Sequence, residues 1–109
     1  MAAFFIVSVL GALLCVLGAI NMTGNVSSLH WYHRQRVTEE NRKPFGRLVG
    51  LGNLLIGASM IVFGVLYLAF ELTQVAALVS GGVAVFLVGV VVGLAISFYA
   101  MFKYNKGIF

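Results

Sequence analysis

Three long apolar runs are separated by short polar stretches along the chain. The runs cover about residues 2–22, 45–70 and 75–102. A helix needs about 20 mostly apolar residues to cross the hydrocarbon core of a bilayer, so each run is long enough for one crossing. The pattern predicts an all-α integral membrane protein, a single membrane domain over residues 1–109 with three transmembrane helices and a loop over residues 23–44. The first run lacks the basic flank of a signal peptide, and we expect it to be retained.

Composition supports a membrane protein and excludes an ordinary soluble domain. The chain is 61% hydrophobic and 9% charged, whereas soluble domains have about 25% charged residues. Its formal net charge is +4, but the basic residues cluster beside apolar runs. Such clustering is typical of membrane topology rather than of nucleic-acid binding, and we expect no nucleic-acid partner. The single cysteine, Cys15, is expected to be a small buried apolar side chain.

The distribution of basic residues predicts the orientation in the membrane. Most of them lie in or beside the 23–44 loop, and Lys103 and Lys106 follow the third run, whereas the turn at residues 71–74 has none. Because Lys and Arg favour the cytoplasmic side of short loops, the loop and the C-terminus are expected in the cytoplasm and the N-terminus outside.

The loop before the second run carries a helix-start signal. Thr38 is a good N-cap and is followed by Glu39 and Glu40, which suit the positive end of a helix dipole. Pro44 is expected to end that short turn, with a bend at Lys43–Pro44, and to open the second spanning helix.

The loop also gathers residues suited to a membrane surface or to a protein partner. Aromatic rings favour the bilayer interface, and cations favour anionic lipid phosphates. The candidate lipid or partner contacts are Trp31, Arg34, Arg36, Arg42, Lys43 and Arg47. A solvated loop that only sets topology is the alternative. His30 and His33 leave a metal-binding or pH-responsive role open, but no third ligand lies close to them in the sequence, and we predict no metal and no cofactor.

Each run contains small residues at helical spacing. Such stripes let helix backbones approach closely in lipid, where no hydrophobic drive favours association. The first stripe is Ser8, Gly11, Cys15 and Gly18; the second is Gly46, Gly50, Asn53, Gly57 and Gly64; the third is Gly82, Gly89, Gly93 and Ser97. Gly46 with Gly50, and Gly89 with Gly93, form GxxxG patterns. Three stripes exceed what a compact trio of helices needs, which favours a homo-oligomer or a bundle docked on a membrane-protein partner.

Asn53 stands out because it is a strongly polar residue in the middle of an apolar run. An interhelical hydrogen bond is its expected role, and a ligand or ion contact is the alternative. No charged residue lies in the middle of any run, although such charges usually mark ion paths and substrate sites. No catalytic motif is present, so an enzyme is not expected.

One segment resembles a known group of proteins. Residues 27–57, SSLHWYHRQRVTEENRKPFGRLVGLGNLLIG, resemble the central part of small bacterial membrane proteins of unknown function, with Thr38, Glu39, Glu40 and Gly46 at the matching positions. The segment is also loosely similar to immunity proteins that protect peptide-toxin producers. The resemblance implies a location in the bacterial cytoplasmic (inner) membrane and supplies no catalytic or binding residues.

These observations lead to one main hypothesis and two alternatives. The main hypothesis is a non-enzymatic accessory, regulatory or immunity-type interaction protein that packs through its glycine-rich helix faces. The first alternative is a small homo-oligomeric channel or transporter, with Ser8, Asn53 and Ser97 along a weakly polar path between protomers. The second alternative is a membrane sensor that binds anionic lipid through the loop.

Overall fold

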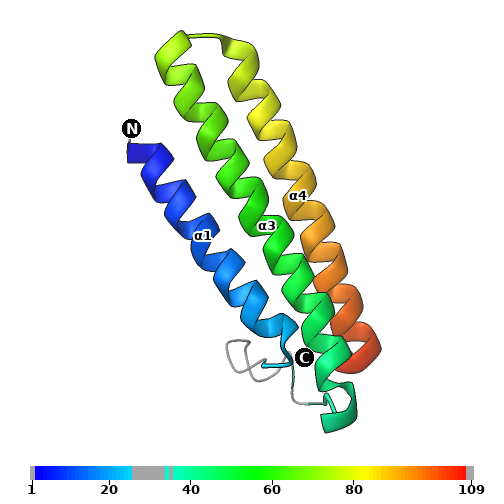
Figure 1. Cartoon of the computed structure of the whole chain (residues 1–109). Coiled ribbons are helices and arrows are strands. Elements are labelled where there is room, and N and C mark those ends of the chain that lie inside the picture. The colour runs from blue at the N-terminus through cyan, green and yellow to red at the C-terminus, as the bar shows by residue number, and fades with distance from the viewer. Residues whose placement is uncertain (1, 26–33, 35, 108–109) are drawn as a thin grey trace.

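The computed structural model describes residues 2–25, 34 and 36–107. It contains helix α1 (Ala2–Met22), helix α3 (Glu39–Thr73) and helix α4 (Ala76–Tyr104), and no strand occurs among the described residues. All three helices are long and apolar enough to cross a membrane, so the prediction of an all-α protein with three spanning helices is confirmed. The helices lie roughly side by side, with α3 between α1 and α4 (Figure 1).

The start of α3 agrees with the cap signal but not with the predicted break. The Thr38 side chain accepts a hydrogen bond from the Asn41 backbone N–H at 3.3 Å, as expected of an N-cap. The helix then continues through Pro44, so the prediction that Pro44 ends a separate turn was wrong. A proline this close to a helix start removes one backbone bond near an exposed end, since Glu39 and Glu40 are exposed. Water can satisfy the freed carbonyl there.

A tight connection joins α3 to α4. Gln74 caps α3 in the left-handed conformation, with φ 61°, and its backbone N–H donates to the Phe70 carbonyl at 2.6 Å. Val75 follows in an extended conformation, and α4 begins at Ala76. The connection of two residues forces the second helix to return antiparallel along the first.

Helices α1 and α4 both pack along α3 rather than on one another. Residues of α3 that meet α4 directly precede glycines that meet α1, as Val49 precedes Gly50 and Ile56 precedes Gly57. Successive helical residues are about 100° apart around the axis. Three helices in mutual contact would form a triangle with angles of about 60°. The angle at α3 is wider than that, so α1 and α4 are held apart, and we call this arrangement an open trio.

The α1–α3 interface is built from facing glycines. A Cβ placed on Gly18 would lie 2.7 Å from the carbonyl oxygen of Gly50, and one on Gly11 would lie 2.7 Å from the carbonyl oxygen of Gly57. Gly46 faces the backbone of Asn21 in the same way. Real Cβ atoms are not found at such distances, so this approach of the two backbones requires glycine on both helices.

Side chains contribute more to the α3–α4 interface. One facing pair occurs there, because a Cβ on Gly93 would lie 2.6 Å from the carbonyl oxygen of Gly52. Elsewhere a glycine of α4 receives a side chain of α3, as Gly89 receives Ser59 and Gly82 receives Phe63. The Phe63 ring also packs on Phe86 of α4, with ring centroids 5.7 Å apart.

Candidate functional site at the basic end

The buried apolar side chains of the described residues gather at one end of the molecule, where α3 begins and α4 ends. They are Phe45, Val49, Ala100 and Met101, and Val37, Leu48 and Tyr104 pack against them. The Phe45 and Tyr104 rings meet edge to face, with centroids 6.4 Å apart. The same end carries Arg36, Arg42, Lys43, Arg47, Lys103 and Lys106. The basic end is therefore the best-packed part of the structure and the candidate functional site.

A polar contact joins α1 to α3 at this end. The Asn53 side-chain amide donates to the Asn21 Oδ1 at 3.0 Å, which is the interhelical hydrogen bond expected of Asn53. The Asn21 amide in turn donates to the Asn25 carbonyl at 2.9 Å, beyond the end of α1. Asn21 is fully buried, and the sequence reasoning missed it because it lies in the last turn of the first run. Its three-residue spacing from Gly18 was the available signal.

A second polar contact ties the segment before α3 to the tail after α4. The Arg36 backbone N–H donates to the Asn105 Oδ1 at 2.7 Å, and the Arg36 Nη1 donates to the Lys106 carbonyl at 3.1 Å. Asn105 is fully buried and its amide donates to the Gly107 carbonyl at 3.0 Å. Residues about seventy positions apart in the sequence are thus held together. Nothing in the local sequence indicates this pairing.

The predicted lipid or partner contacts have different surroundings. Arg42, Lys43 and Arg47 are exposed on the first turns of α3, and Arg34 is partly buried. Arg36 is exposed but makes the two bonds to the tail just described. Lys103 extends over the rings of Tyr99 and Tyr104, at 5.7 Å and 5.3 Å from their centroids. Trp31, His30 and His33 lie outside the described residues.

The predicted small-residue stripes all face inward within the single chain. Gly11, Gly18 and the α3 stripe Gly46, Gly50, Gly57 and Gly64 lie between α1 and α3, and Gly82, Gly89, Gly93 and Ser97 lie between α3 and α4. The excess of stripes taken to favour a homo-oligomer is therefore accounted for by the open trio, in which α3 carries two packed faces.

The three polar residues of the channel hypothesis do not lie along one path. Ser8 packs against Gly64 between α1 and α3, and Ser97 packs against Gly52 between α3 and α4. Both hydroxyl groups are buried and have no hydrogen-bond partner among the described residues. Asn53 is engaged by Asn21. Residues enclosed in two separate intrachain interfaces give no support to a path between protomers.

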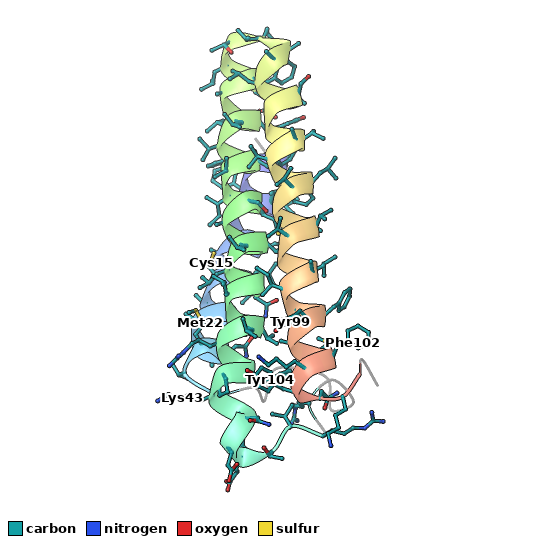
Figure 2. The ribbon with its side chains drawn as sticks, turned by 90° about the vertical axis from the view of Figure 1, so that its right-hand side faces the viewer. Cys15, Met22, Lys43, Tyr99, Phe102 and Tyr104 are labelled. Atoms are coloured by element: carbon teal, nitrogen blue, oxygen red, sulfur yellow. The ribbon has the colours of Figure 1, made fainter. Side chains whose placement is uncertain are left out.

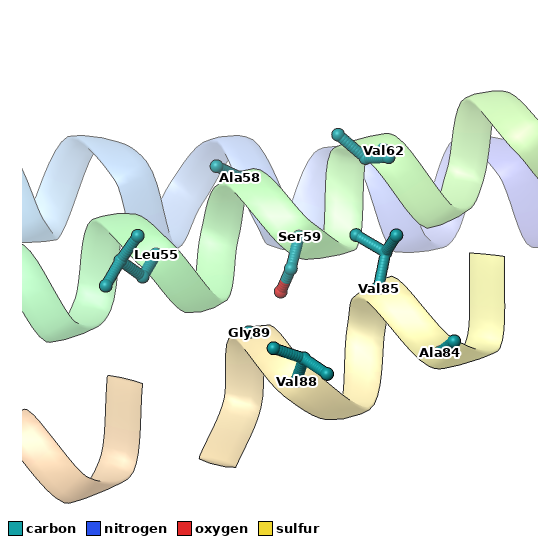
Figure 3. A pocket seen from close by; sticks show the side chains of 8 residues that line it. All are labelled: Leu55, Ala58, Ser59, Val62, Ala84, Val85, Val88 and Gly89. Carbon is teal, nitrogen blue, oxygen red and sulfur yellow. The ribbon is translucent and has the colours of Figure 1, made fainter. Parts of the chain in front are cut away.

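An apolar groove of about 500 Å³ runs along the outer side of α3 and α4 (Figure 3). It is lined by Leu55, Ala58, Ser59, Val62, Ala84, Val85, Val88 and Gly89. Its one hydroxyl group, on Ser59, donates to the Ile56 carbonyl of its own helix at 2.8 Å. The groove thus presents methyl groups and no polar atom that would select a ligand, and its surface suits lipid chains.

Comparison of the chain with protein-family models, with curated proteins and with solved structures finds no match. Among the residues that the structure describes, no group of three or more His, Cys, Asp or Glu side chains is placed to hold a metal ion.

Proposed function

We propose that this protein is a non-enzymatic, multi-pass protein of the bacterial cytoplasmic membrane that acts as an accessory, regulatory or immunity-type interaction protein. Its basic end would lie in the cytoplasm and its N-terminus outside, since Lys and Arg favour the cytoplasmic side. The basic end would be the surface that a partner membrane protein recognises.

The observation that supports this proposal is that the packing faces of the helices are already occupied within the chain. The glycine faces of α1, α3 and α4 pack within the chain, so they are not left over for a partner as the sequence suggested. A feature with chemical specificity is the basic end. The whole chain has seven Lys and Arg residues and three acidic ones, and the basic residues gather at this end. Hydrogen bonds from Arg36 to Asn105 and Lys106 fix the segments that present this charge. A fixed charged surface favours recognition because less ordering is needed on binding.

Site-specific photocrosslinking in native membranes tests the proposed surface. A photoreactive residue at Arg42, on the basic end, is expected to give a discrete protein adduct. The matched control is Leu72, which is 71% exposed at the opposite end and is expected to give none. Equal adducts at both positions, or none at either, would contradict recognition through the basic end.

Cysteine labelling tests the proposed orientation separately. In a variant with Cys15 replaced by alanine, a cysteine at the exposed Gln74 should react with an impermeant reagent in intact cells. A cysteine at the exposed Lys106 should react only after the cells are opened. The reverse pattern would place the basic end outside and remove the basis for a cytoplasmic partner.

A further inference from the structure

A second groove lies at the basic end itself and combines a cation with an apolar floor. It has a volume of about 370 Å³ and is lined by Met22, Pro44, Arg47, Leu48, Leu51 and Tyr104. Its walls therefore come from the end of α1, the first turns of α3 and the end of α4. Met22 and Tyr104 lie on the two flanks of α3, and Lys43 lies on the Met22 side (Figure 2). The volume is within the range of small-molecule sites in proteins.

Arg47, which lines this groove, and its neighbour Lys43 form no ion pair with an acidic residue in the described parts of the chain. Arg47 and Lys43 are both exposed and lie one helical turn apart. Neither side chain makes an ion pair or hydrogen bond with the residues that the structure describes. The chain has three acidic residues in all. Glu71 lies at the other end of α3, and Glu39 and Glu40 lie in its exposed first turn, four and three residues before Lys43. The exposed charges of Lys43 and Arg47 are therefore open to an anion from outside the protein.

The order of these groups along α3 matches the order of groups in a phospholipid. Lys43 and Arg47 come first, and the apolar side chains of Leu48 and Leu51 follow toward the middle of the helix. Leu51 lies about 6 Å deeper than Arg47, at about 1.5 Å per residue. A guanidinium group can bind a phosphate through two parallel hydrogen bonds, and the side chains beneath it offer an acyl chain an apolar surface.

We propose that this groove binds one anionic phospholipid, with its phosphate on Arg47 and Lys43 and an acyl chain along Leu48 and Leu51. Tyr104 and Met22 border the chain on either side. This inference goes beyond the proposed function and does not depend on a protein partner. It also differs from a diffuse attraction of the whole basic loop, because it assigns one lipid to one groove.

Native mass spectrometry of the protein released from nanodiscs of mixed phosphatidylcholine and phosphatidylglycerol provides the test. We expect one retained phosphatidylglycerol per protein. The double variant Lys43→Gln, Arg47→Gln should lower that occupancy by about tenfold or more, since each surface cation contributes about 1 kcal/mol to anionic-lipid binding. The matched control, Lys103→Gln with Lys106→Gln, removes the same charge from the same end and should keep the bound lipid. Equal loss in both double variants would show diffuse attraction and overturn the proposal, as would retention in both.

A second pair of variants tests the acyl-chain part of the groove without changing charge. Leu51→Trp should fill the groove and lower the phosphatidylglycerol occupancy. Leu87→Trp should not, because Leu87 lies on α4 outside this groove, with its side chain 55% exposed. Inorganic phosphate should fail to displace the lipid, because it has no acyl chain. Displacement by phosphate, or unchanged occupancy in Leu51→Trp, would reduce the site to a headgroup contact and contradict the proposal. Retained helicity by circular dichroism serves as the folding control for every variant.

Discussion

The two helix interfaces of this protein achieve close packing in different ways. Between α1 and α3 the backbones meet at pairs of facing glycines, Gly11 with Gly57 and Gly18 with Gly50. Between α3 and α4 one such pair occurs, and elsewhere side chains such as Ser59 and Phe63 fill the space over a glycine. This difference in packing parallels a difference in the length of the segments that connect the helices. The α3–α4 pair is a hairpin closed by two residues, whereas sixteen residues, 23–38, separate α1 from α3.

A short connection keeps its two helices close whatever their faces, because the second helix is held at a high effective concentration near the first. Helix α1 has a longer connection and must be held by the contacts that it makes. In lipid those contacts are van der Waals packing and hydrogen bonds. The glycine pairs and the hydrogen bond from Asn53 to Asn21 supply both. Substitutions between α1 and α3 should therefore have larger effects than equivalent ones between α3 and α4.

The largest expected effect comes from a bulky side chain at Gly50. Gly50→Leu would drive a side chain into the Gly18 carbonyl and Met22, and the two helices would have to separate. We expect a loss of about 3 kcal/mol or more, in the range of severe overpacking. Unfolding in mixed detergent micelles measures it. Gly52→Leu is the matched variant in the hairpin, and a greater loss there than at Gly50 would contradict the comparison.

The next effect concerns the asparagine pair. Asn21→Leu should cost about 1–3 kcal/mol, because the partly buried Asn53 amide loses its acceptor and the Asn25 carbonyl loses its donor. Asn53→Leu should cost less, about 0.6–2 kcal/mol, as for other interhelical hydrogen bonds in membranes. A double-mutant cycle isolates the pair. Additive losses would mean that the two side chains do not stabilise each other.

A smaller effect is expected at the tie between the α3 entry and the tail. Asn105→Ala removes the oxygen that accepts the Arg36 backbone N–H, which should cost about 1 kcal/mol. The readout is local: the Arg36 amide should exchange with deuterium faster, while amides in the middle of α3 keep their protection. Asn41→Ala, near the same end but away from the tail, is the control. Unchanged exchange at Arg36 would show that the bond does not hold the segment.

The smallest effect distinguishes two neighbouring glycines of α4. A Cβ on Gly81 would meet nothing within 4 Å, whereas one on Gly82 would lie 3.2 Å from the Phe63 ring. Gly81→Ala should therefore stabilise α4 by up to about 1 kcal/mol through helix propensity. Gly82→Ala should gain less, because Phe63 has to move. Thermal unfolding of the two variants in one detergent makes the comparison, and equal gains would mean that Phe63 adapts without cost.

Much of the architecture could be predicted from local sequence. The lengths of the apolar runs predicted three spanning helices, because the bilayer sets a minimum length for a crossing. Thr38 predicted the start of α3, since an N-cap acts on the next few backbone amides. Pro44 was interpreted wrongly because its effect depends on whether the lost bond lies at an exposed helix end. Helix spacing likewise identified the stripe from Gly46 to Gly64 as one face.

The amino-acid sequence by itself determined which segments are helical and which residues share a face, because both follow from the period of a single helix and from the solvent that surrounds it. Only the tertiary structure decided which faces meet. It placed two packed faces on α3, paired Asn53 with Asn21, and joined Arg36 to Asn105 across most of the chain. Those contacts depend on how three helices are positioned in space, and the spacing of residues along any one of them carries no information about its neighbour.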